Sequence, residues 1–315
     1  MNVDLQLQPA VEPTGIYLFG DERKLRSEGT EWLYFGVMFV SRVNAQALYD
    51  QLMRIRREVG YQGQLHLADM KNEKGEKFET AQRWLDLGIE AMLHPDGPFK
   101  FNILGVKLDR LDKTAFGIDE DKDRIPHARV YTRFFRTVVT SGLQLWWYNS
   151  PITIIRTYHD SEGNLQNDPW FDGNLARRLG RERFTSFEEQ SVRLIRSDHR
   201  LERTETKTFR AAQMLQFVDL LLGTISNILH PNPNVKRRSA KYKLTERVLS
   251  VVDAVSSSSD THSASRQFGL SYSQFPKSSG VIVGSESPFR RGEFYRLSPN
   301  SFIEKRNAQG ILFEW

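Results

Sequence analysis

The segment TFRAAQMLQFVDLLLGTISNIL, residues 208–229, has helical periodicity and is the most apolar helix that the chain encodes. The loop HPNPN at 230–234 ends it. Within this helix, Asp219 is flanked by Phe217 and Val218 on one side and by three leucines on the other. Burying an unpaired carboxylate costs several kcal/mol, so the fold has to bring Asp219 a partner.

The other periodic segments alternate between strands and helices. Short runs rich in β-branched and aromatic residues predict strands at 16–19, 32–40, 99–109, 152–160 and 191–198. Apolar residues at helical spacing predict helices at about 44–60, 76–93, 127–147, 173–179, 208–229 and 241–255. The first two strands are joined by a plain loop and are expected to be antiparallel, whereas the strand at 152–158 follows a long helix and can pair in parallel. This order predicts an α/β fold with a mixed sheet flanked by helices.

The composition changes after residue 255. The stretch SSSSDTHSASRQ is polar and low in complexity, which is typical of a flexible link. We therefore divide the chain into a main domain, residues 1–255, and a less regular C-terminal extension, residues 256–315, whose fold the sequence leaves open. With 315 residues in total, the chain is long enough for a large domain with a sizeable core.

Several classes of protein are disfavoured by what the sequence lacks. It contains no cysteine, so it has no disulfide, thiolate metal site or cysteine nucleophile. It has neither a Gly-x-Ser-x-Gly elbow nor a phosphate-binding Gly-x-x-x-x-Gly-Lys loop. The N-terminal stretch MNVDLQLQPAVEP is not a signal peptide, and no apolar run approaches the roughly 18 residues that span a bilayer. We expect a cytoplasmic protein with no membrane partner.

Three aspartates each interrupt or end an apolar segment. Asp21 ends the first strand in GIYLFGDER, Asp160 ends the strand ITIIRTYHD, and Asp219 lies in the apolar helix. Taken singly, the first two are also typical of turns, and the third is equally consistent with a salt bridge to an arginine. Taken together, they are expected to converge at one edge of the sheet. An all-oxygen cluster suits Mg²⁺ or Mn²⁺, and two such ions about 4 Å apart would clamp the attacking and leaving oxygens of a phosphodiester.

The histidines provide further candidates. His66 and Asp69 lie in the short alternating segment LHLADM, and His159 precedes Asp160. A neutral imidazole near a metal-bound water can act as a base or a positioning group, so His66 is a candidate catalytic residue. A mixed His/Asp metal centre is an alternative, although no His-x-x-x-His pair is present. His159 is expected to face away from Asp160, because neighbouring side chains alternate along a strand.

The chain is mildly basic, with a net charge of +5 and a pI of about 9.3, and part of this charge is clustered. The stretch KRRSAKYKLTER at 236–247 has one acid against a set of basic residues: Lys236, Arg237, Arg238, Lys241, Lys243 and Arg247. Such a cluster can neutralise the phosphates of DNA or RNA. The alternative is a solvated helix start after a proline-rich loop.

Four of these segments together resemble a bacterial family, the domain-of-unknown-function family 3800 (DUF3800). They are IYLFGDER, QLHLADMKN, ITIIRTYHD and MLQFVDLLLG, within residues 15–230, and the last is the most specific. Family members have an RNase-H/integrase-like core, so the resemblance implies an RNase-H-like sheet in which the first strand and the strand at 152–158 are neighbours. It also implies that Asp21, Asp160 and Asp219 converge as metal ligands, with Glu22 or Asp69 as a fourth.

The chain departs from the family pattern at Arg23, where the family usually has serine. A cation at this position either binds a substrate phosphate or marks a site that has lost its metals. The resemblance implies a nuclease, a hydrolase that cleaves DNA or RNA with Mg²⁺ or Mn²⁺, acting in bacterial antiviral and mobile-element defence. In this interpretation Glu22, His66 or Asp69 assists catalysis, and the basic stretch holds the nucleic acid. The alternative is a catalytically inactive subunit that binds nucleic acid or a protein partner in a larger defence complex.

Overall fold

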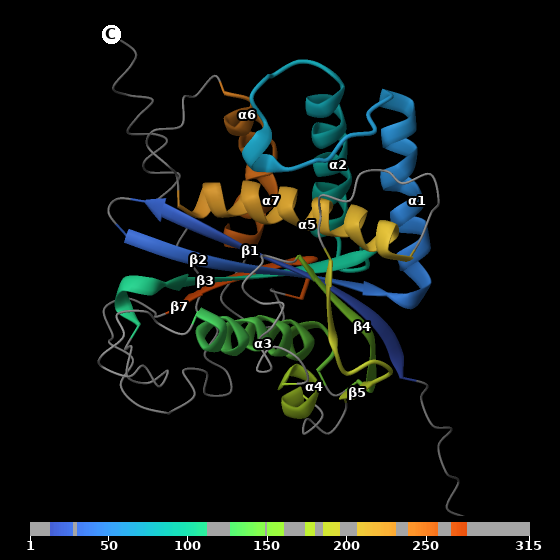
Figure 1. The fold of residues 1–315 in the computed structure, drawn as a ribbon, viewed down its shortest axis with the longest axis vertical. Helices are drawn as coiled ribbons and strands as arrows, with labels where there is room; N and C mark the ends of the chain where they lie inside the picture. The colour runs from blue at the N-terminus through green and yellow to red at the C-terminus, as the bar shows by residue number, and fades with distance from the viewer. Residues whose placement is uncertain are drawn as a thin grey trace, which may run out of the picture.

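The central element of the fold is a single β-sheet. The computed structural model of the chain describes residues 13–27, 30–111, 127–148, 150–160, 174–179, 185–195, 207–230, 239–257 and 266–275. Within these ranges the sheet contains seven strands: β1 (Thr14–Ser27), β2 (Thr30–Ser41), β3 (Phe99–Lys107), β4 (Ile152–Asp160), β5 (Thr185–Phe187), β6 (Val192–Ile195) and β7 (Leu270–Phe275). Their order across the sheet is β5-β4-β1-β2-β3-β7 (Figure 1), and β6 pairs with the C-terminal half of β4.

The sheet is mixed in strand direction. β1, β2 and β3 form an antiparallel meander, and β4 runs parallel to β1. β5 and β6 are parallel to β4, and β7 is parallel to β3. The antiparallel first pair and the parallel pairing of the strand after the long helix, both predicted from the connections, are confirmed. The chain therefore has the mixed α/β fold that its periodic segments predict.

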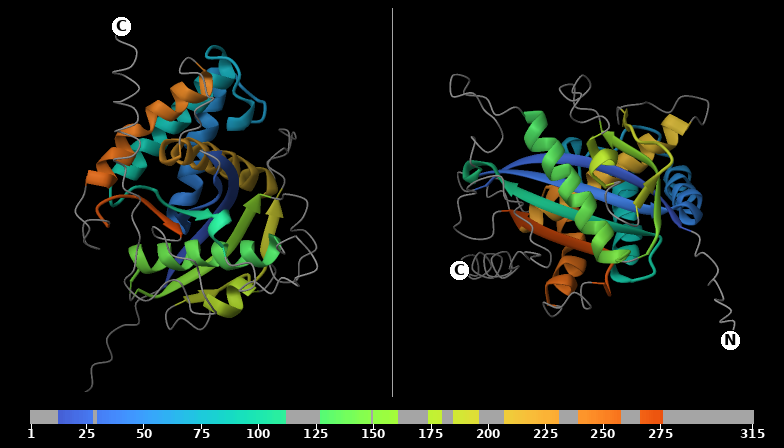
Figure 2. Two further views of the ribbon diagram at one scale, coloured as in Figure 1. Left: turned by 90° about the vertical axis from the view of Figure 1, so that its left-hand side faces the viewer. Right: turned by 90° about the horizontal axis from the view of Figure 1, so that it is seen from below.

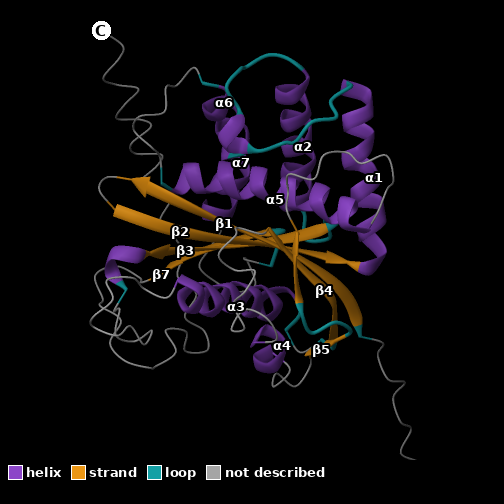
Figure 3. Ribbon diagram, in the orientation of Figure 1, coloured by secondary structure: helices purple, strands orange, loops and turns teal. Residues whose placement is uncertain are grey.

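Helices cover both faces of the sheet (Figures 1 and 3). One face carries α3 (His127–Trp146), which lies across the strands (Figure 2), and α4 (Asn174–Leu179). The opposite face carries the other α-helices of the described ranges: α1 (Arg42–Val59), α2 (Glu76–Leu93), α5 (Lys207–Leu229), α6 (Ala240–Arg247) and α7 (Leu249–Ser257). Two short 3₁₀ turns are also present, η1 (Leu67–Asp69) and η2 (Leu108–Arg110). Each face has its own apolar core, so the sheet is the middle layer of three.

Helix α5 is the central helix of the core on its face. It contacts β1, β2 and β4 beneath it and also packs against α1, α2 and α6. By length and composition, the segment Thr208–Leu229 is apolar enough to cross a membrane, and 89% of its most apolar window is buried inside the structure. This corrects the expectation that no apolar run reaches that length. The helix is apolar around most of its circumference because it is surrounded by other elements.

The structure differs from the predicted elements in several places. β1 does not end at the predicted position, because its pairing with β2 continues without a break as far as Ser27 opposite Thr30. The helix predicted at 241–255 is two helices, since Val248 closes α6 with a tight turn in which its N–H bonds the carbonyl of Thr245. α1 begins directly after Ser41, slightly before the predicted start at about residue 44. The sequence does not predict β5, which has only three residues.

Residues beyond 255 contribute to the same sheet. β7 pairs with β3 from Phe101 opposite Leu270 to Val106 opposite Phe275. Part of the stretch described above as a C-terminal extension is therefore an edge strand of the main sheet. The polar link at 258–265 and the residues from 276 onwards lie outside the described residues.

Candidate functional site

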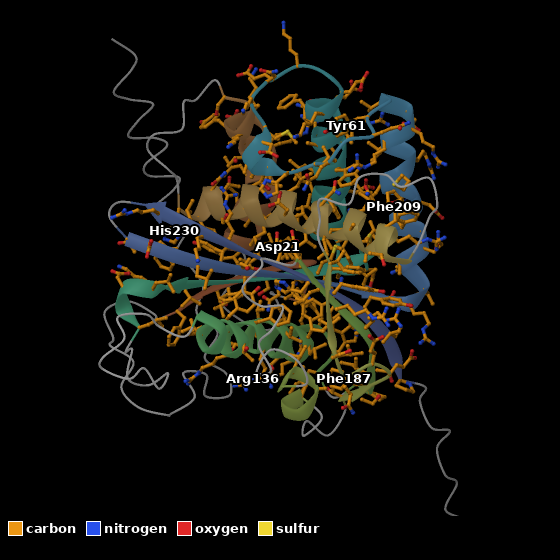
Figure 4. All side chains as sticks on the ribbon, viewed as in Figure 1. Asp21, Tyr61, Arg136, Phe187, Phe209 and His230 are labelled. Carbon is orange, nitrogen blue, oxygen red and sulfur yellow. The ribbon has the colours of Figure 1, made fainter. Side chains whose placement is uncertain are left out.

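β1 carries polar residues through the middle of the sheet, between β2 and β4. Because side chains alternate along a strand, Asp21 and Arg23 share one face and Glu22 lies on the other. Nη2 of Arg23 donates a hydrogen bond to Oδ1 of Asn227 in α5, at 2.9 Å. The hydroxyl of Tyr131 in α3 donates one to Oε2 of Glu22, at 2.5 Å. Asp21 therefore faces α5, and Figure 4 shows it in the layer between the sheet and that helix.

Asp21 lies beside Asp160 in the neighbouring strand. In the parallel pair of β1 and β4, Gly20 is opposite His159, so the residues that follow them are side by side where β4 ends. The close approach of α3 on the opposite face requires glycine at position 20, since a Cβ there would lie 2.5 Å from the ring of Phe135. The predicted adjacency of the first two aspartates is thus a consequence of the strand register.

Asp21 is a buried carboxyl group surrounded by negative charge. Its residue is 7% exposed, and burial raises its pKa well above the usual range. The negative charges of Asp219, Glu22 and Asp160 raise this pKa further. The backbone N–H of Glu22 donates a hydrogen bond to Oδ1 of Asp21 at 2.8 Å and opposes the rise. Such a cluster favours either a proton or a bound cation at this position.

Asp219 approaches the same place from α5. Its Oδ2 accepts a hydrogen bond from the backbone N–H of Leu67 at 2.8 Å, and its Oδ1 lies 3.5 Å from Nε2 of His66. Burial raises the pKa of Asp219, and the charge of Asp160 raises it further, whereas His66, the Leu67 N–H and Arg23 lower it. A buried carboxylate such as Asp219 needs polar partners. The segment around His66 and the side chain of Arg23 provide them.

Arg23 places a cation among these carboxylates. Burial lowers the pKa of Arg23, while the charges of Asp219 and Asp21 raise it. The guanidinium lies against Gly223 of α5, where a Cβ would be 2.5 Å from Nη1 of Arg23 and would overlap Cδ2 of Leu67. The missing side chain at position 223 lets the arginine and the leucine both pack on the helix one turn after Asp219.

Replacing Gly223 with alanine is expected to destabilise the protein. The new methyl group would overlap Leu67 and crowd Arg23, and overpacking of this kind costs about 1–3 kcal/mol, which outweighs the roughly 1 kcal/mol that alanine gains in a helix. Urea denaturation measures the change in the free energy of unfolding. Ser250→Ala, at an exposed position of α7, is the control and should change it by less than about 0.5 kcal/mol. A Gly223→Ala variant as stable as the wild type would contradict this packing.

A buried hydrogen-bonded group lies behind Asp21, on the α3 face. The hydroxyl of Tyr131 is 2.5 Å from Oε2 of Glu22 and 2.5 Å from Nε2 of His159, and Nδ1 of His159 is 2.6 Å from the carbonyl oxygen of Asp160. That carbonyl can only accept, so Nδ1 carries a proton, and burial lowers the pKa of His159 to about 4. The hydroxyl of Tyr131 has a single proton, so it cannot donate to Glu22 and His159 at the same time. Tyr131 links β1 to β4 at the level of the aspartates.

Tyr131→Phe is expected to lower the free energy of unfolding by about 1–3 kcal/mol, because it removes a partner from two buried polar groups. The side chains of Glu22 and His159 are 3% and 0% exposed, so water does not replace the lost hydroxyl easily. Denaturant titration measures the change. Tyr148→Phe removes a hydroxyl from a side chain that is 63% exposed and should have little effect. Equal stability of both variants would argue against the bonded group.

The structure brings five of the predicted site residues together on the α5 face: Asp21, Arg23, Asp160, Asp219 and His66. It separates two others from them. Glu22 belongs to the group on the α3 face, and Asp69 is exposed, with its charge acting on Tyr61. His159 faces α3, away from the aspartates, as strand alternation predicts.

The structure corrects the prediction that Asp21 and Asp160 both lie at the ends of strands. β4 does end at Asp160, but Asp21 lies in the interior of β1, opposite Gly36 of β2. The physical reason is the continued antiparallel pairing, which carries β1 past the acidic residues instead of turning at them. The first aspartate is therefore held by strands on both sides.

The basic stretch is described only in part, and two of its described residues form ion pairs. Three of its residues lie outside the described ranges: Lys236, Arg237 and Arg238. Nζ of Lys243 is 2.5 Å from Oε2 of Glu73, and Nη2 of Arg247 donates a hydrogen bond to Oδ2 of Asp86 at 2.7 Å. Lys241 is half-buried. The two pairs join α6 to α2 and to the loop before it, so they give Lys243 and Arg247 a structural role.

Three residues that contact a predicted site residue or the loop that carries His66 are missing from the prediction: Tyr131, Gln216 and Asn227. Each is a polar residue in a helix whose spacing indicates core packing. The sequence contains no signal for them, because it does not reveal which strand or loop will approach a given side of a helix. Asp219 is recognisable in the same helix only because a charge is far costlier to bury than an amide.

The donors on the α5 face fit a divalent cation of the magnesium type. Asp21, Asp160 and Asp219 offer only carboxylate oxygens, which are the ligands that such ions prefer. Their negative charges repel one another, and a bound cation would relieve this repulsion. Their arrangement is not that of a completed site: in the described part of the chain, no group of three or more His, Asp or Glu side chains is placed to hold a metal ion. Arg23 supplies part of the positive charge instead.

Comparison with known proteins adds no assignment. No model of a known protein family and no curated protein matches this chain. The resemblance to the family named above stays a prediction carried by four short segments, and the function is argued from the geometry of the α5 face.

Proposed function

We propose that the protein is a divalent-metal-dependent nuclease, a hydrolase of phosphodiester bonds in DNA or RNA. The observation that carries the proposal is the convergence of aspartates from β1, β4 and α5, where burial and mutual repulsion raise the pKa of Asp21. Gathering like charges in a buried place lowers stability, and such arrangements are typical of functional sites. A nuclease role in bacterial defence against phages or mobile elements follows only from analogy with the resembled family.

The strand arrangement supports an RNase-H-like assignment for the sheet. The first strand pairs antiparallel with the second and parallel with the fourth, which is the neighbourhood that the resemblance implies for the two strand aspartates. The third contributor, Asp219, comes from the segment MLQFVDLLLG, the most specific part of that resemblance. The same face therefore carries a residue from each of the four segments on which the resemblance rests.

In the proposed site Asp21, Asp160 and Asp219 hold Mg²⁺ or Mn²⁺. When bound, such ions supply Lewis-acid stabilisation and an activated water, which agrees with a chain that has no cysteine nucleophile. His66 is 37% exposed and lies 3.5 Å from Asp219, so it is placed to orient a water or a substrate phosphate, or to accept a proton. Arg23 is positioned to bind a phosphate oxygen if the ions displace it from the carboxylates.

Incubation with labelled DNA, RNA and DNA–RNA hybrids, with Mg²⁺, Mn²⁺ or EDTA, tests the proposal. We expect cleavage of at least one substrate with either metal, no cleavage with EDTA, and loss of cleavage in Asp219→Asn. Calorimetric titration with Mn²⁺ should show binding to the wild type and weaker binding to the variant. Binding of nucleic acid without cleavage of any substrate would contradict a nuclease function.

A second candidate function is a catalytically inactive subunit that binds nucleic acid or a protein partner. The observation that favours it is Arg23, whose charge already acts on both Asp21 and Asp219 and whose Nη2 is bonded to Asn227. A guanidinium in this place can stabilise the carboxylates without any metal. The two candidates differ in whether the site binds a divalent ion, and variants of Arg23 separate them.

A further inference from the structure

The loop between α1 and α2 is attached to the protein by a buried arginine. Arg56 is 2% exposed, and its guanidinium lies over the rings of Trp84, at 4.7 Å, and Tyr61, at 5.6 Å. Burial lowers the pKa of Arg56 to about 10, so it is still a cation at neutral pH. No Asp or Glu of the described residues pairs with it. Burying a charge is costly unless it is hydrogen-bonded. The hydrogen-bond partners of Arg56 therefore show which parts of the protein this cation stabilises.

Arg56 binds the loop and α5 together. Nη1 donates a hydrogen bond to the carbonyl oxygen of Gly63 at 2.7 Å and a longer one to that of Tyr61 at 3.5 Å. Nη2 donates to Oε1 of Gln216, in α5, at 2.7 Å. The same oxygen of Gln216 accepts the backbone N–H of Leu65 at 2.8 Å. One guanidinium and one amide therefore connect α1, the loop and α5.

One turn further along α5, Asp219 repeats this contact by accepting the backbone N–H of Leu67 at 2.8 Å. The N–H groups of alternate loop residues thus bond to side chains three positions apart on the helix. His66 lies between them in extended conformation, with φ −139° and ψ 128°. Leu65 and Leu67 are both buried, which fixes the segment on either side of His66. The position of His66 near Asp219 is set by this double attachment.

We propose that Gln216 and Arg56 are positioning residues that hold His66 at Asp219. The inference rests on the proposed function, which gives His66 its task. Neither residue is placed among the carboxylates, and both act through the backbone of the loop. If Gln216 loses its oxygen, the loop keeps the attachment at Leu67 but loses the one at Leu65, immediately before His66.

Hydrogen exchange on the full chain without metal tests the attachment directly. In Gln216→Leu, which has a similar volume and no acceptor, we expect the amides of residues 64–68 to exchange at least about tenfold faster, while those of α2 keep their rates. Gln216→Glu retains the acceptor oxygen and should restore slow exchange. Gln213→Leu is the matched control, because Gln213 is equally buried in the same helix and its Oε1 has no hydrogen-bond partner among the described residues.

Cleavage kinetics test whether Gln216 acts through His66. We expect Gln216→Leu to lower kcat by about 10- to 100-fold with KM nearly unchanged, and Gln216→Glu to recover most of the loss. His66→Ala should lower kcat by at least as much. The double variant His66→Ala/Gln216→Leu should be no slower than His66→Ala, since no imidazole is left to position.

The outcomes separate this inference from the proposed function. Unchanged exchange at residues 64–68 in Gln216→Leu, or kcat losses that multiply in the double variant, would overturn the positioning role. If the wild type cleaves no substrate, the nuclease proposal fails, and the exchange data together with nuclear Overhauser contacts between the His66 ring and α5 still decide the attachment. If these contacts are lost only in Gln216→Leu, the attachment of the loop to α5 is supported. If they persist in Gln216→Leu, the attachment is refuted.

Discussion

Asp21→Asn is expected to abolish metal-dependent cleavage and, without metal, to make the protein more stable. Loss of a ligand removes several kcal/mol of transition-state stabilisation, which lowers kcat by about 10²- to 10³-fold or more. Stability rises because burial and the charges of Asp219, Glu22 and Asp160 disfavour the ionised form of Asp21 in the folded protein. An amide of the same shape still accepts the backbone hydrogen bond but carries no charge.

The gain in stability depends on pH. The pKa of Asp21 is raised in the folded protein, so above the usual value of 3.8 there is a window in which the native state keeps a proton that the unfolded chain has lost. The stability of the wild type should therefore fall as pH rises through that window, and the variant should lack this part of the fall. Denaturant unfolding in EDTA at a series of pH values measures both.

Asp50→Asn, which changes an exposed acid on α1, serves as the control for this comparison and should alter neither cleavage nor the pH profile. Lower stability of Asp21→Asn at pH 8 in EDTA would refute the repulsion among the carboxylates. Full cleavage by the same variant would remove Asp21 from the proposed ligands, whatever its effect on stability.

Arg23→Ala is expected to lower the free energy of unfolding of the metal-free protein by about 3–5 kcal/mol, the cost of removing one partner from a buried set of charges. Asp21 and Asp219 lose the cation that acts on both, and Asn227 loses a hydrogen-bond donor. Mn²⁺ should restore much of this loss, because an ion that binds only the folded state stabilises it. Thermal unfolding with Mn²⁺ or EDTA measures the effect.

The same variant separates the two candidate functions. In a nuclease site, Arg23→Ala should bind Mn²⁺ more tightly than the wild type, since the ion no longer competes with the guanidinium. If calorimetry detects no Mn²⁺ binding to either protein, the aspartates are a structural group held by Arg23, and the inactive subunit is favoured. Arg54→Ala, at an exposed position of α1, controls for the general loss of an arginine.

Long periodic elements with marked ends are predictable from this sequence. The bounds predicted for α2, Glu76 to Leu93, are those of the structure, because apolar residues at helical spacing lie between Gly75 and the stop at His94. The end of β1 is not predictable in this way. Gly20 followed by two acids has the composition of a turn. These residues nevertheless continue the strand, because they pair with β2.

The candidate site is predictable only where burial conflicts with charge. Asp160 and Asp219 stand out because each follows or interrupts an apolar run. The face that a residue occupies depends on sheet register, so the separation of Glu22 from Asp21 is visible only in the fold. Arg56 has no such signal, because on a helix of mixed polarity an arginine resembles any surface residue.

The interior position of Asp21 in a doubly paired strand limits how this site can change during evolution. Deleting one residue of β1 before Gly20 would shift every later side chain to the opposite face, so that Glu22 would turn toward α5 and Asp21 toward Tyr131. Both layers would be altered by that single event. Substitutions can therefore modify this site during evolution and keep the strand register. Insertions and deletions in the first half of β1 would disrupt the register.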